Sequence, residues 1–330
     1  MILPVKNGGE YVKQCVGSIL SQTYANCNLH ILENCSTDGT AEWLRTLNDE
    51  RIIIYPSDRP LSIEENWGRI ISIQKNEYMT MIGHDDVLDK NYLEVMNGLI
   101  ERYPDASLYQ THFRYIDRNG KFIRRCKKMD ERQDAAEFLA GFLQNKIDIN
   151  GTGFMMRSQD YDTAGGIPSY PNLLFADFEL WIRLTAIDYM VASSEECFSF
   201  RVHRSTTSIS TDLKLHHAFA LFIKYLENLK EQNPIFENVI RDYAIPFIRF
   251  WCKGLTHRLL RTPKEKRNNL RVSLFLSQCK KYADELVPGN NFDPLETLSL
   301  RLAEKIDSFA ITRGLFLAFK KIYSKPVLSA

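Results

Sequence analysis

The sequence predicts an α/β protein with a mainly parallel sheet flanked by helices, followed by a helical C-terminal region. Two observations support this prediction. Between residues 1 and 90, short apolar runs of strand length alternate with helical repeats, and such a rhythm places parallel strands side by side. After about residue 211, apolar residues recur at the spacing of helices alone. With 330 residues, the chain can bury a large core and can contain more than one domain.

The strands and helices are expected in alternation along the N-terminal part. Strands are expected at residues 1–5, 29–32, 51–55 and 78–82, where short apolar runs end in polar turns. Helices are expected at residues 11–20, 43–47 and 62–73, and the last begins at a capping box formed by Ser62 and Glu65. Further helices are expected at residues 216–229, 235–260, 270–286 and 298–323, with Pro246 kinking or breaking the second of these.

Polar side chains follow the predicted strands at the point where each strand ends. They are Asn7, Asn34, Ser36, Asp38, Asp85 and Asp86. In an open α/β sheet, ligands bind outside the carboxyl ends of the strands. We therefore expect these groups to gather at one edge of the sheet.

Asp85 and Asp86 are the most informative pair, because they directly follow a buried apolar run. Neighbouring side chains of an extended chain point to opposite sides. The two carboxylates can therefore serve two different groups, for example a hydroxylated ligand and a divalent cation. The alternative is a solvated Asp-Asp turn with no ligand.

Several classes of protein lack support in the sequence. No Gly-x-Gly-x-x-Gly follows the first strand and no P-loop pattern occurs, which argues against a dehydrogenase and a P-loop enzyme. A Ser-His-Asp triad is not excluded, but no Gly-x-Ser-x-Gly elbow supports it. There is no apolar run of membrane-spanning length and no secretory signal. The seven cysteines are scattered and form no Cys-x-x-Cys pair, which is typical of reduced thiols in a cytosol.

The net charge of +1 hides a basic block between residues 241 and 281. This segment contains eleven Lys and Arg against Asp242 and Glu265, a net charge of +9, so the remainder carries about −8. Such a block indicates an anionic partner surface. Two interpretations stay open: a packed helix with a solvated basic face, and a membrane-surface helix with Phe250 and Trp251 in the interface. Nucleic-acid binding is a weaker third, because no recognition motif accompanies the charge.

An ordered series of segments resembles the signature of the family 2 inverting glycosyltransferases. The segments are residues 4–8, 18–24, 33–40, 83–88, 151–157, 165–168, 176–184 and 201–205 with Ser208. The resemblance covers roughly residues 1–210. It implies a nucleotide-binding α/β sheet fused to a smaller acceptor-side sheet, with a catalytic domain at 1–210 and a helical region at 211–330.

The resemblance also implies a reaction and its residues. The family transfers a sugar from a nucleotide-diphosphate sugar to an acceptor hydroxyl with inversion, here for a cell-surface polysaccharide or glycolipid. Asp177 would be the catalytic base. Asp86 would bind Mg²⁺ or Mn²⁺, with His203 as a further metal or diphosphate ligand. The residues implied in donor binding are Pro4, Asn7, Glu33, Asn34, Asp38 and Asp85, of which Asp85 would contact the ribose or the sugar.

Departures from the family pattern and rival interpretations remain. Glu33 and Asn34 stand where most members have two acids, and Gly83 stands where an earlier acid is common. The first strand begins a few residues late, which suggests a late or trimmed start. Asp177 could be only a helix N-terminal acid, and His203 only a polar loop residue.

Rival functions are a sugar nucleotidyltransferase and a non-catalytic sugar-nucleotide-binding module. The expected partners are a nucleotide-sugar donor, a saccharide or lipid-linked acceptor and an anionic membrane surface, without nucleic acid. The expected location is cytoplasmic, with peripheral attachment to the inner face of the plasma membrane left open.

Overall fold

The computed structural model describes residues 1–203 and 211–323, and the chain divides into two compact units. The first unit consists of Met1–Phe138 and Lys146–Arg204, and the second of Leu139–Asn145 and Ser205–Ala330. The predicted domain boundary at residue 210 lies outside the described residues, as do Ser205 and Ser208 of the last motif. That boundary therefore stays a prediction.

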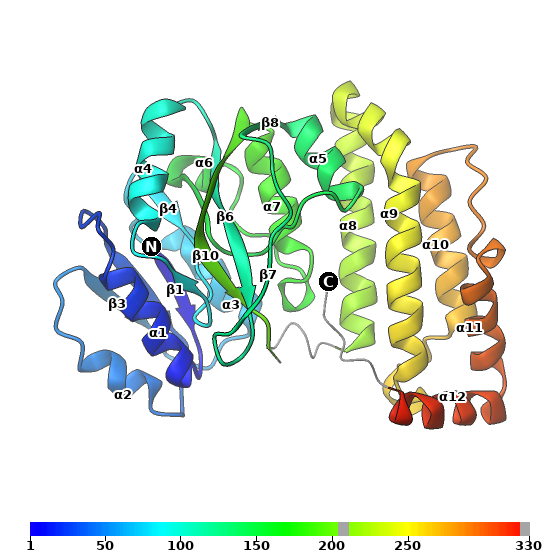
Figure 1. The fold of residues 1–330 in the computed structure, drawn as a ribbon. Coiled ribbons are helices and arrows are strands. Elements are labelled where there is room, and N and C mark those ends of the chain that lie inside the picture. Colours follow the sequence, from blue (N-terminus) through cyan, green and yellow to red (C-terminus); the bar gives the residue numbers. More distant parts are fainter. Residues whose placement is uncertain (204–210, 324–330) are drawn as a thin grey trace. The chain divides into compact units, whose positions relative to one another are not determined.

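The first sheet has three parallel strands, as the alternating pattern predicts. Its strands are β1 (Ile2–Val5), β2 (Leu29–Glu33) and β3 (Ile52–Pro56), in the order β1-β2-β3. The helices between and after them are α1 (Gly9–Leu20), α2 (Thr40–Arg45) and α3 (Ile63–Gly68), with the 3-10 turn η1 (Arg69–Ser72) (Figure 1). The predicted capping box is present, since the Ser62 hydroxyl accepts from the Glu65 amide at 3.1 Å.

A second, mixed sheet follows, and its strands come from most of the rest of the first unit. Its central order is β4 (Tyr78–Thr80), β9 (Phe154–Arg157), β6 (Leu108–Ile116), β10 (Tyr189–Arg201) and β5 (Val87–Leu88). β7 (Phe122–Arg125) pairs with β6, and β8 (Arg132–Asp134) pairs with β10. The associated helices are α4 (Tyr92–Arg102), α6 (Ser158–Thr163), η2 (Pro171–Leu173) and α7 (Ala176–Thr185).

The strand at residues 78–82 differs from the prediction in its pairing. The alternating pattern implied a fourth parallel strand of the first sheet, whereas β4 pairs antiparallel with β9 in the second. One parallel bridge, between Ile2 and Met81, connects it to β1, and the Ile82 amide donates to the Ile2 carbonyl at 3.0 Å. This bridge brings the loop after β4 beside the carboxyl end of β1.

The second unit is helical, as predicted. It contains α8 (Asp212–Gln232), α9 (Pro234–Arg261), α10 (Val272–Leu286), α11 (Leu298–Ser308) and α12 (Ala310–Ile322), with short 3-10 turns η3 (Lys264–Lys266) and η4 (Pro294–Glu296). The last part of α5 (Ala135–Leu143) also belongs to it. Phe142 of α5 packs against Phe222 and Phe247, with ring centroids 5.8 and 5.5 Å apart.

Two details of these helices bear on the prediction. α9 continues through Pro246 as a single helix, so of the two predicted effects, a kink or a break, the break does not occur. The predicted helix at 298–323 is two helices, because Phe309 between them has an extended backbone with φ −114° and ψ 132°. None of the described helices is long and apolar enough to cross a bilayer.

Candidate active site

The turn between β1 and α1 and the loop after β2 are connected by direct hydrogen bonds. Asn7 adopts a left-handed backbone, with φ 53°, which lets the chain turn sharply after β1. Its amide N–H donates to the Ser36 hydroxyl at 2.9 Å, and its side-chain oxygen accepts from the Thr37 amide at 2.8 Å. Asn7 therefore fixes one loop against the other.

Asp38 strengthens the same connection. Its carboxylate accepts from the Gly9 amide at 3.0 Å and from the Thr40 amide at 3.1 Å. Desolvation alone would raise the pKa of Asp38, but the hydrogen bonds from Thr40 and Gly9 lower it below its usual value. An exposed, ionised carboxylate thus lies at the N-terminal end of α1.

Glu33, Asn34 and Pro4 are buried, and the polar groups of the first two are engaged within the protein. Glu33 accepts from the Ser36 and Cys35 amides at 2.7 and 3.2 Å. The Asn34 amide donates to the carbonyl of Leu61 at 3.0 Å and accepts from its N–H at 2.7 Å. These bonds shape the loops, and the roles of all three residues in donor binding stay predictions.

The loop after β4 forms a tight turn that separates the two acidic side chains. The Asp86 amide donates to the Gly83 carbonyl at 3.1 Å. The Asp86 side chain is buried, and its two oxygens accept from the Thr152 hydroxyl at 2.7 Å and the Arg201 amide at 2.9 Å. Burial, followed by the nearby charge of Asp85, raises the pKa of Asp86 well above its usual value.

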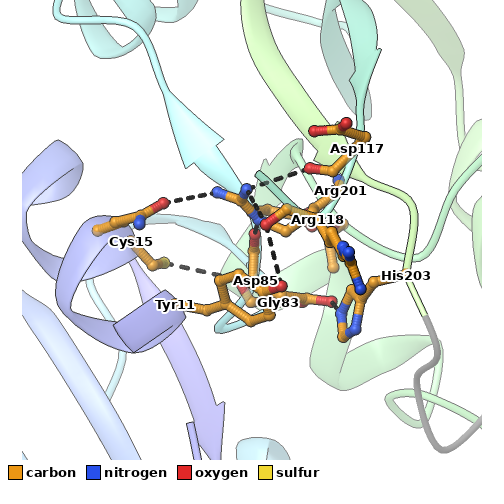
Figure 2. A network of polar contacts seen from close by, with 11 residues as sticks. Tyr11, Cys15, Gly83, Asp85, Asp117, Arg118, Arg201 and His203 are labelled. Carbon is orange, nitrogen blue, oxygen red and sulfur yellow. Dashed lines mark hydrogen bonds and ion pairs between the residues drawn. The ribbon is translucent and has the colours of Figure 1, made fainter. Parts of the chain in front are cut away.

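Asp85 is directed toward His203 instead. Its carboxylate lies 2.5 Å from the His203 Nε2 atom, although the two residues are 118 positions apart (Figure 2). Burial alone would raise the pKa of Asp85, but the hydrogen bond to His203 and the charges of His84 and His203 lower it. The structure thus brings His203 to Asp85, whereas the sequence grouped His203 with Asp86.

Gly83 is the residue that permits this packing of carboxylates. A Cβ atom at position 83 would lie 2.8 Å from Oδ1 of Asp85 and 3.1 Å from Oδ2 of Asp86. Distances this short would force the carboxylates to move. In this chain, a side chain at position 83 would therefore displace both carboxylates.

Arg201, at the end of β10, connects the acidic loop to two other segments (Figure 2). Its Nε donates to the Asp85 carbonyl at 2.7 Å, and one terminal nitrogen donates to the Gln14 side chain of α1 at 2.8 Å. The other donates to the carbonyls of Asp117 and Arg118, in the turn after β6, at 3.3 and 3.4 Å. Five donors in a fixed planar fork suit such multiple contacts.

Tyr11 of α1 completes this network. The Arg201 guanidinium lies over the Tyr11 ring, 4.7 Å from its centroid, and the Tyr11 hydroxyl donates to the Arg118 carbonyl at 3.0 Å. The ring also contacts His203, with centroids 5.1 Å apart. The side chains of Arg201 and Tyr11 together fix where Asp85 and His203 meet.

Asp177 lies in the first turn of α7 and is half-buried. Desolvation by the surrounding protein raises the pKa of its carboxyl group to about 7. The chain before it contains Leu173 and Phe175 with φ of 56° and 68°, a backbone conformation that is unfavourable for large side chains. Backbone strain of this kind concentrates at functional sites.

The loop from Asn150 to Gly153 connects Asp177 with the acidic turn. A Cβ atom at Gly151 would lie 3.5 Å from the Asp177 carboxylate, and the next residue, Thr152, donates to Asp86. Trp181 of α7 fixes this loop, because its indole N–H donates to the Asn150 carbonyl at 2.9 Å. Trp181 is fully buried and stacks on Phe154, so its indole ring is held in the core.

Some residues of this network were present in the sequence motifs without an expected role. Arg201 and Thr152 belong to motifs, and Tyr11 was counted only toward the helical repeat. The position of Arg201 in the last motif, two residues before His203, is the signal in the sequence; that the arginine is buried and paired is known only from the structure. The sequence carries no comparable signal for Tyr11.

A metal site of the usual kind is not preformed in the described part of the chain. Within residues 1–203 and 211–323, no cluster of three or more His, Cys, Asp or Glu side chains could hold a metal ion. Asp85 and His203 supply one carboxylate and one imidazole in contact with each other. Oxygen and imidazole donors suit Mn²⁺ and Mg²⁺, provided that a ligand such as a diphosphate supplies further oxygens.

Comparison with known sequences identifies the protein family of residues 1–164. Residues 1–164 match the family model "Glycosyl transferase family 2". Glycosyltransferase GlyG of Streptococcus pneumoniae is 25% identical over 124 residues, which span 37% of this chain and 41% of GlyG. An uncharacterized glycosyltransferase of Rickettsia typhi is 23% identical over 263 residues, 79% of this chain and 76% of the relative.

Comparison with solved structures supports the same fold. S. aureus TarS, residues 1–349 in complex with UDP-GlcNAc, has a TM-score of 0.63 at 10% identity, covering 92% of this chain and 90% of that chain. The same TarS segment in complex with UDP has a TM-score of 0.61 at 9% identity, covering 92% and 89%. The resemblance drawn from the motifs is confirmed, and with it the predicted fold class. Residues 1–164 thus belong to glycosyl transferase family 2, and the chain over most of its length is similar to glycosyltransferases.

Proposed function

We propose that this glycosyltransferase transfers a sugar from a nucleotide-diphosphate sugar to an acceptor hydroxyl, with inversion and with a divalent cation. The observation that carries the proposal is the loop at residues 150–153. Gly151 of this loop lies beside the Asp177 carboxylate, and the neighbouring Thr152 donates a hydrogen bond to Asp86. A carboxylate suited to proton transfer and an acidic turn suited to a donor thus both lie next to one short loop. TarS, a protein of similar fold, was crystallised with UDP-GlcNAc, so uridine diphosphate sugars are the first donors to test.

Asp177 is the base of the proposed reaction. A group with a pKa of about 7 is ionised in a substantial fraction at neutral pH and still attracts a proton strongly. It would take the proton of the acceptor hydroxyl as that oxygen attacks the anomeric carbon. Inversion then needs one displacement and no covalent intermediate.

The cation is assigned to Asp85 and His203, which changes the assignment made from the sequence. There, Asp86 was expected to bind the metal and Asp85 the ribose or sugar. Both oxygens of Asp86 are engaged by Thr152 and Arg201, and the residue is buried. Asp85 is less buried and touches His203, so this pair is better placed to face a ligand. When bound, the cation would neutralise the charge that develops on the departing diphosphate.

The acceptor is proposed to be a saccharide or a lipid-linked saccharide of a cell-surface polysaccharide or glycolipid. The matched region spans only 41% of GlyG, so the acceptor and the biological role are part of the proposal. The predicted cytoplasmic location belongs to it as well.

One substitution tests the proposed chemistry. Asp177→Asn should leave the affinity for a uridine diphosphate sugar with Mn²⁺ unchanged and should lower the transfer rate by at least ~10²-fold, because it removes the positioned base. Donor affinity is measured by calorimetry and transfer by mass spectrometry of the product. Asp188→Asn, an exposed acid just beyond α7, is the matched control. Near-normal transfer by Asp177→Asn would show that another group takes the proton.

A further inference from the structure

Helix α12 exposes a stripe of large apolar side chains. Ile311, Leu315, Phe319 and Ile322 follow one another at intervals of four, four and three residues, which places them on one face of the helix. Their exposed fractions are 80%, 67%, 53% and 77%. Phe309, before the helix, is exposed as well. A contiguous apolar surface of this kind on a folded protein marks an interaction site.

The opposite face of α12 is fixed within the second unit, so the stripe has a defined direction. Arg313 donates to the Thr262 carbonyl at 2.5 Å and lies 3.7 Å from the carboxylate of Asp307. The Phe316 ring meets His257 of α9 edge-on, with centroids 6.4 Å apart. Figure 1 shows α12, in red, crossing beside the C-terminal end of α9. The packed residues are 313 and 316, which point away from the stripe.

The surroundings of α12 are basic. Residues 309–323 contain Lys320 and Lys321 and no Asp or Glu; Arg313 is not counted, because it is held beside Asp307 inside the unit. The contact between Arg313 and Thr262 brings the segment 261–266 beside the helix, and this segment exposes Arg261, Lys264 and Lys266 against one acid, Glu265. The apolar stripe is thus accompanied by positive charge.

The apolar residues of the basic block, by contrast, are mostly unavailable. Phe247, Ile248, Leu255, Leu259 and Leu260 of α9 are buried in the second unit. Phe250 is partly exposed and Trp251 is half-buried. The basic residues of α9 therefore lie on a packed helix, and the exposed apolar surface beside them belongs to α12.

We infer that α12 binds an anionic membrane surface, with the apolar stripe in the interface and the basic residues at the lipid headgroups. An exposed apolar face combined with local positive charge is the property that separates such helices from ordinary surface helices. The charge selects anionic lipid, and each Lys or Arg near the surface strengthens binding about fivefold. The inference does not depend on the reaction proposed above.

The test is sedimentation of the full chain with two kinds of vesicle, phosphatidylcholine alone and phosphatidylcholine mixed equally with phosphatidylglycerol. We expect binding to the mixed vesicles to exceed binding to the neutral ones by at least about tenfold at low salt. The preference should decline at high salt, since the Debye length falls from ~10 Å at 0.1 M to ~3 Å at 1 M.

Two sets of variants distinguish binding through the stripe from nonspecific binding through any exposed apolar side chain. The combined substitution Ile311→Ser, Leu315→Ser and Phe319→Ser should lower binding to mixed vesicles at least about tenfold and leave the melting temperature unchanged, because these side chains are exposed. The control is Ile235→Ser with Leu274→Ser, two equally exposed residues on α9 and α10, which should bind as the wild type does.

The inference is wrong if wild-type protein binds neither kind of vesicle, or binds both equally. It is also wrong if the triple substitution leaves binding unchanged. The alternative partner for the apolar stripe is a second copy of the chain. A dimer in analytical ultracentrifugation that the triple substitution dissociates, without any vesicle binding, would replace the membrane with self-association.

Discussion

At the scale of single residues, the site contains three carboxyl groups whose pKa values are shifted in different directions by their surroundings. The pKa of Asp85 is lowered by its contact with His203, whereas those of Asp86 and Asp177 are raised by burial. Groups of one chemical type thereby acquire different tasks. Asp85 is suited to a cation, Asp86 to hydrogen bonds inside the protein, and Asp177 to accepting a proton.

The raised pKa of Asp177 has a consequence for stability as well as for catalysis. Its ordinary value is 3.8 and its folded value about 7. Between these two values, the folded protein keeps a proton that the unfolded chain has lost, so the contribution of Asp177 to stability falls as the pH rises. Asp177→Asn cannot ionise and should be more stable than the wild type above pH 7.

Thermal unfolding at several pH values checks this. The difference in melting temperature between Asp177→Asn and the wild type should grow from about pH 4 to about pH 7 and then stay constant. Asp188→Asn, at an exposed position, should show no such trend. A difference that is equal at pH 4 and pH 8 would mean that Asp177 is not desolvated in the folded protein.

Asp85 and Asp86 should respond differently to substitution. Asp85→Asn should abolish the dependence of UDP binding on Mn²⁺ with little effect on unfolding, because Asp85 is only half-buried and is the proposed ligand of the cation. Asp86→Ala should lower the free energy of unfolding by about 1–3 kcal/mol, because it leaves the buried Thr152 hydroxyl and Arg201 amide without a partner. Calorimetry and urea unfolding measure the two effects, and a reversed pattern would restore Asp86 as the metal ligand.

The sequence identified most of these residues but could not pair them. Adjacent acids after a strand and a histidine in the last motif are visible as residue types. Their mutual contacts depend on chain segments 118 positions apart and on the register of β10. The engagement of Asp86 by Thr152 and of Asn34 by Leu61 likewise needs the folded loops.

At the scale of secondary structure elements, Arg201 connects β10, the acidic loop, α1 and the turn after β6. Arg201→Lys should lower the free energy of unfolding by about 2–4 kcal/mol and weaken UDP binding, because one ammonium group cannot reach all these acceptors. Arg118→Lys is the control, since Arg118 takes part through its backbone carbonyl and its side chain is exposed. Wild-type behaviour of Arg201→Lys, in urea unfolding and calorimetry, would show that the acidic loop keeps its position without the guanidinium.

The elements themselves were predictable to the extent that their signal is local. The first three strands follow from alternation and polar turns, and the α3 start follows from its capping box. β4 was placed in the wrong sheet because a short apolar run does not indicate its pairing partner. The break at Phe309 was missed because apolar residues keep their helical spacing across it.

At the scale of the whole molecule, the second unit includes residues from within the first part of the chain. Leu139–Asn145 belong to it, and the Phe142 ring packs on Phe222 and Phe247. A protein truncated after residue 210 should therefore expose these apolar side chains and aggregate, although it contains every proposed catalytic residue.

Size-exclusion chromatography and binding of an apolar dye compare the truncated and full chains. Adding Phe142→Ser to the truncated chain should reduce both aggregation and dye binding. In the full chain, the same substitution should destabilise the protein by about 3–5 kcal/mol, as loss of a large buried side chain does. A soluble, dye-free truncated chain would show that residues 139–145 find other partners.

Because residues 139–145 belong to the second unit, they are synthesised well before the helices they pack against. Phe142 leaves the ribosome well before Phe222 and Phe247 exist, and α9 is complete only at Arg261. At ordinary elongation rates the delay is on the order of ten seconds. For that period Phe142 is without its packing partners on the nascent chain, which makes this segment prone to aggregation until α8 and α9 are complete.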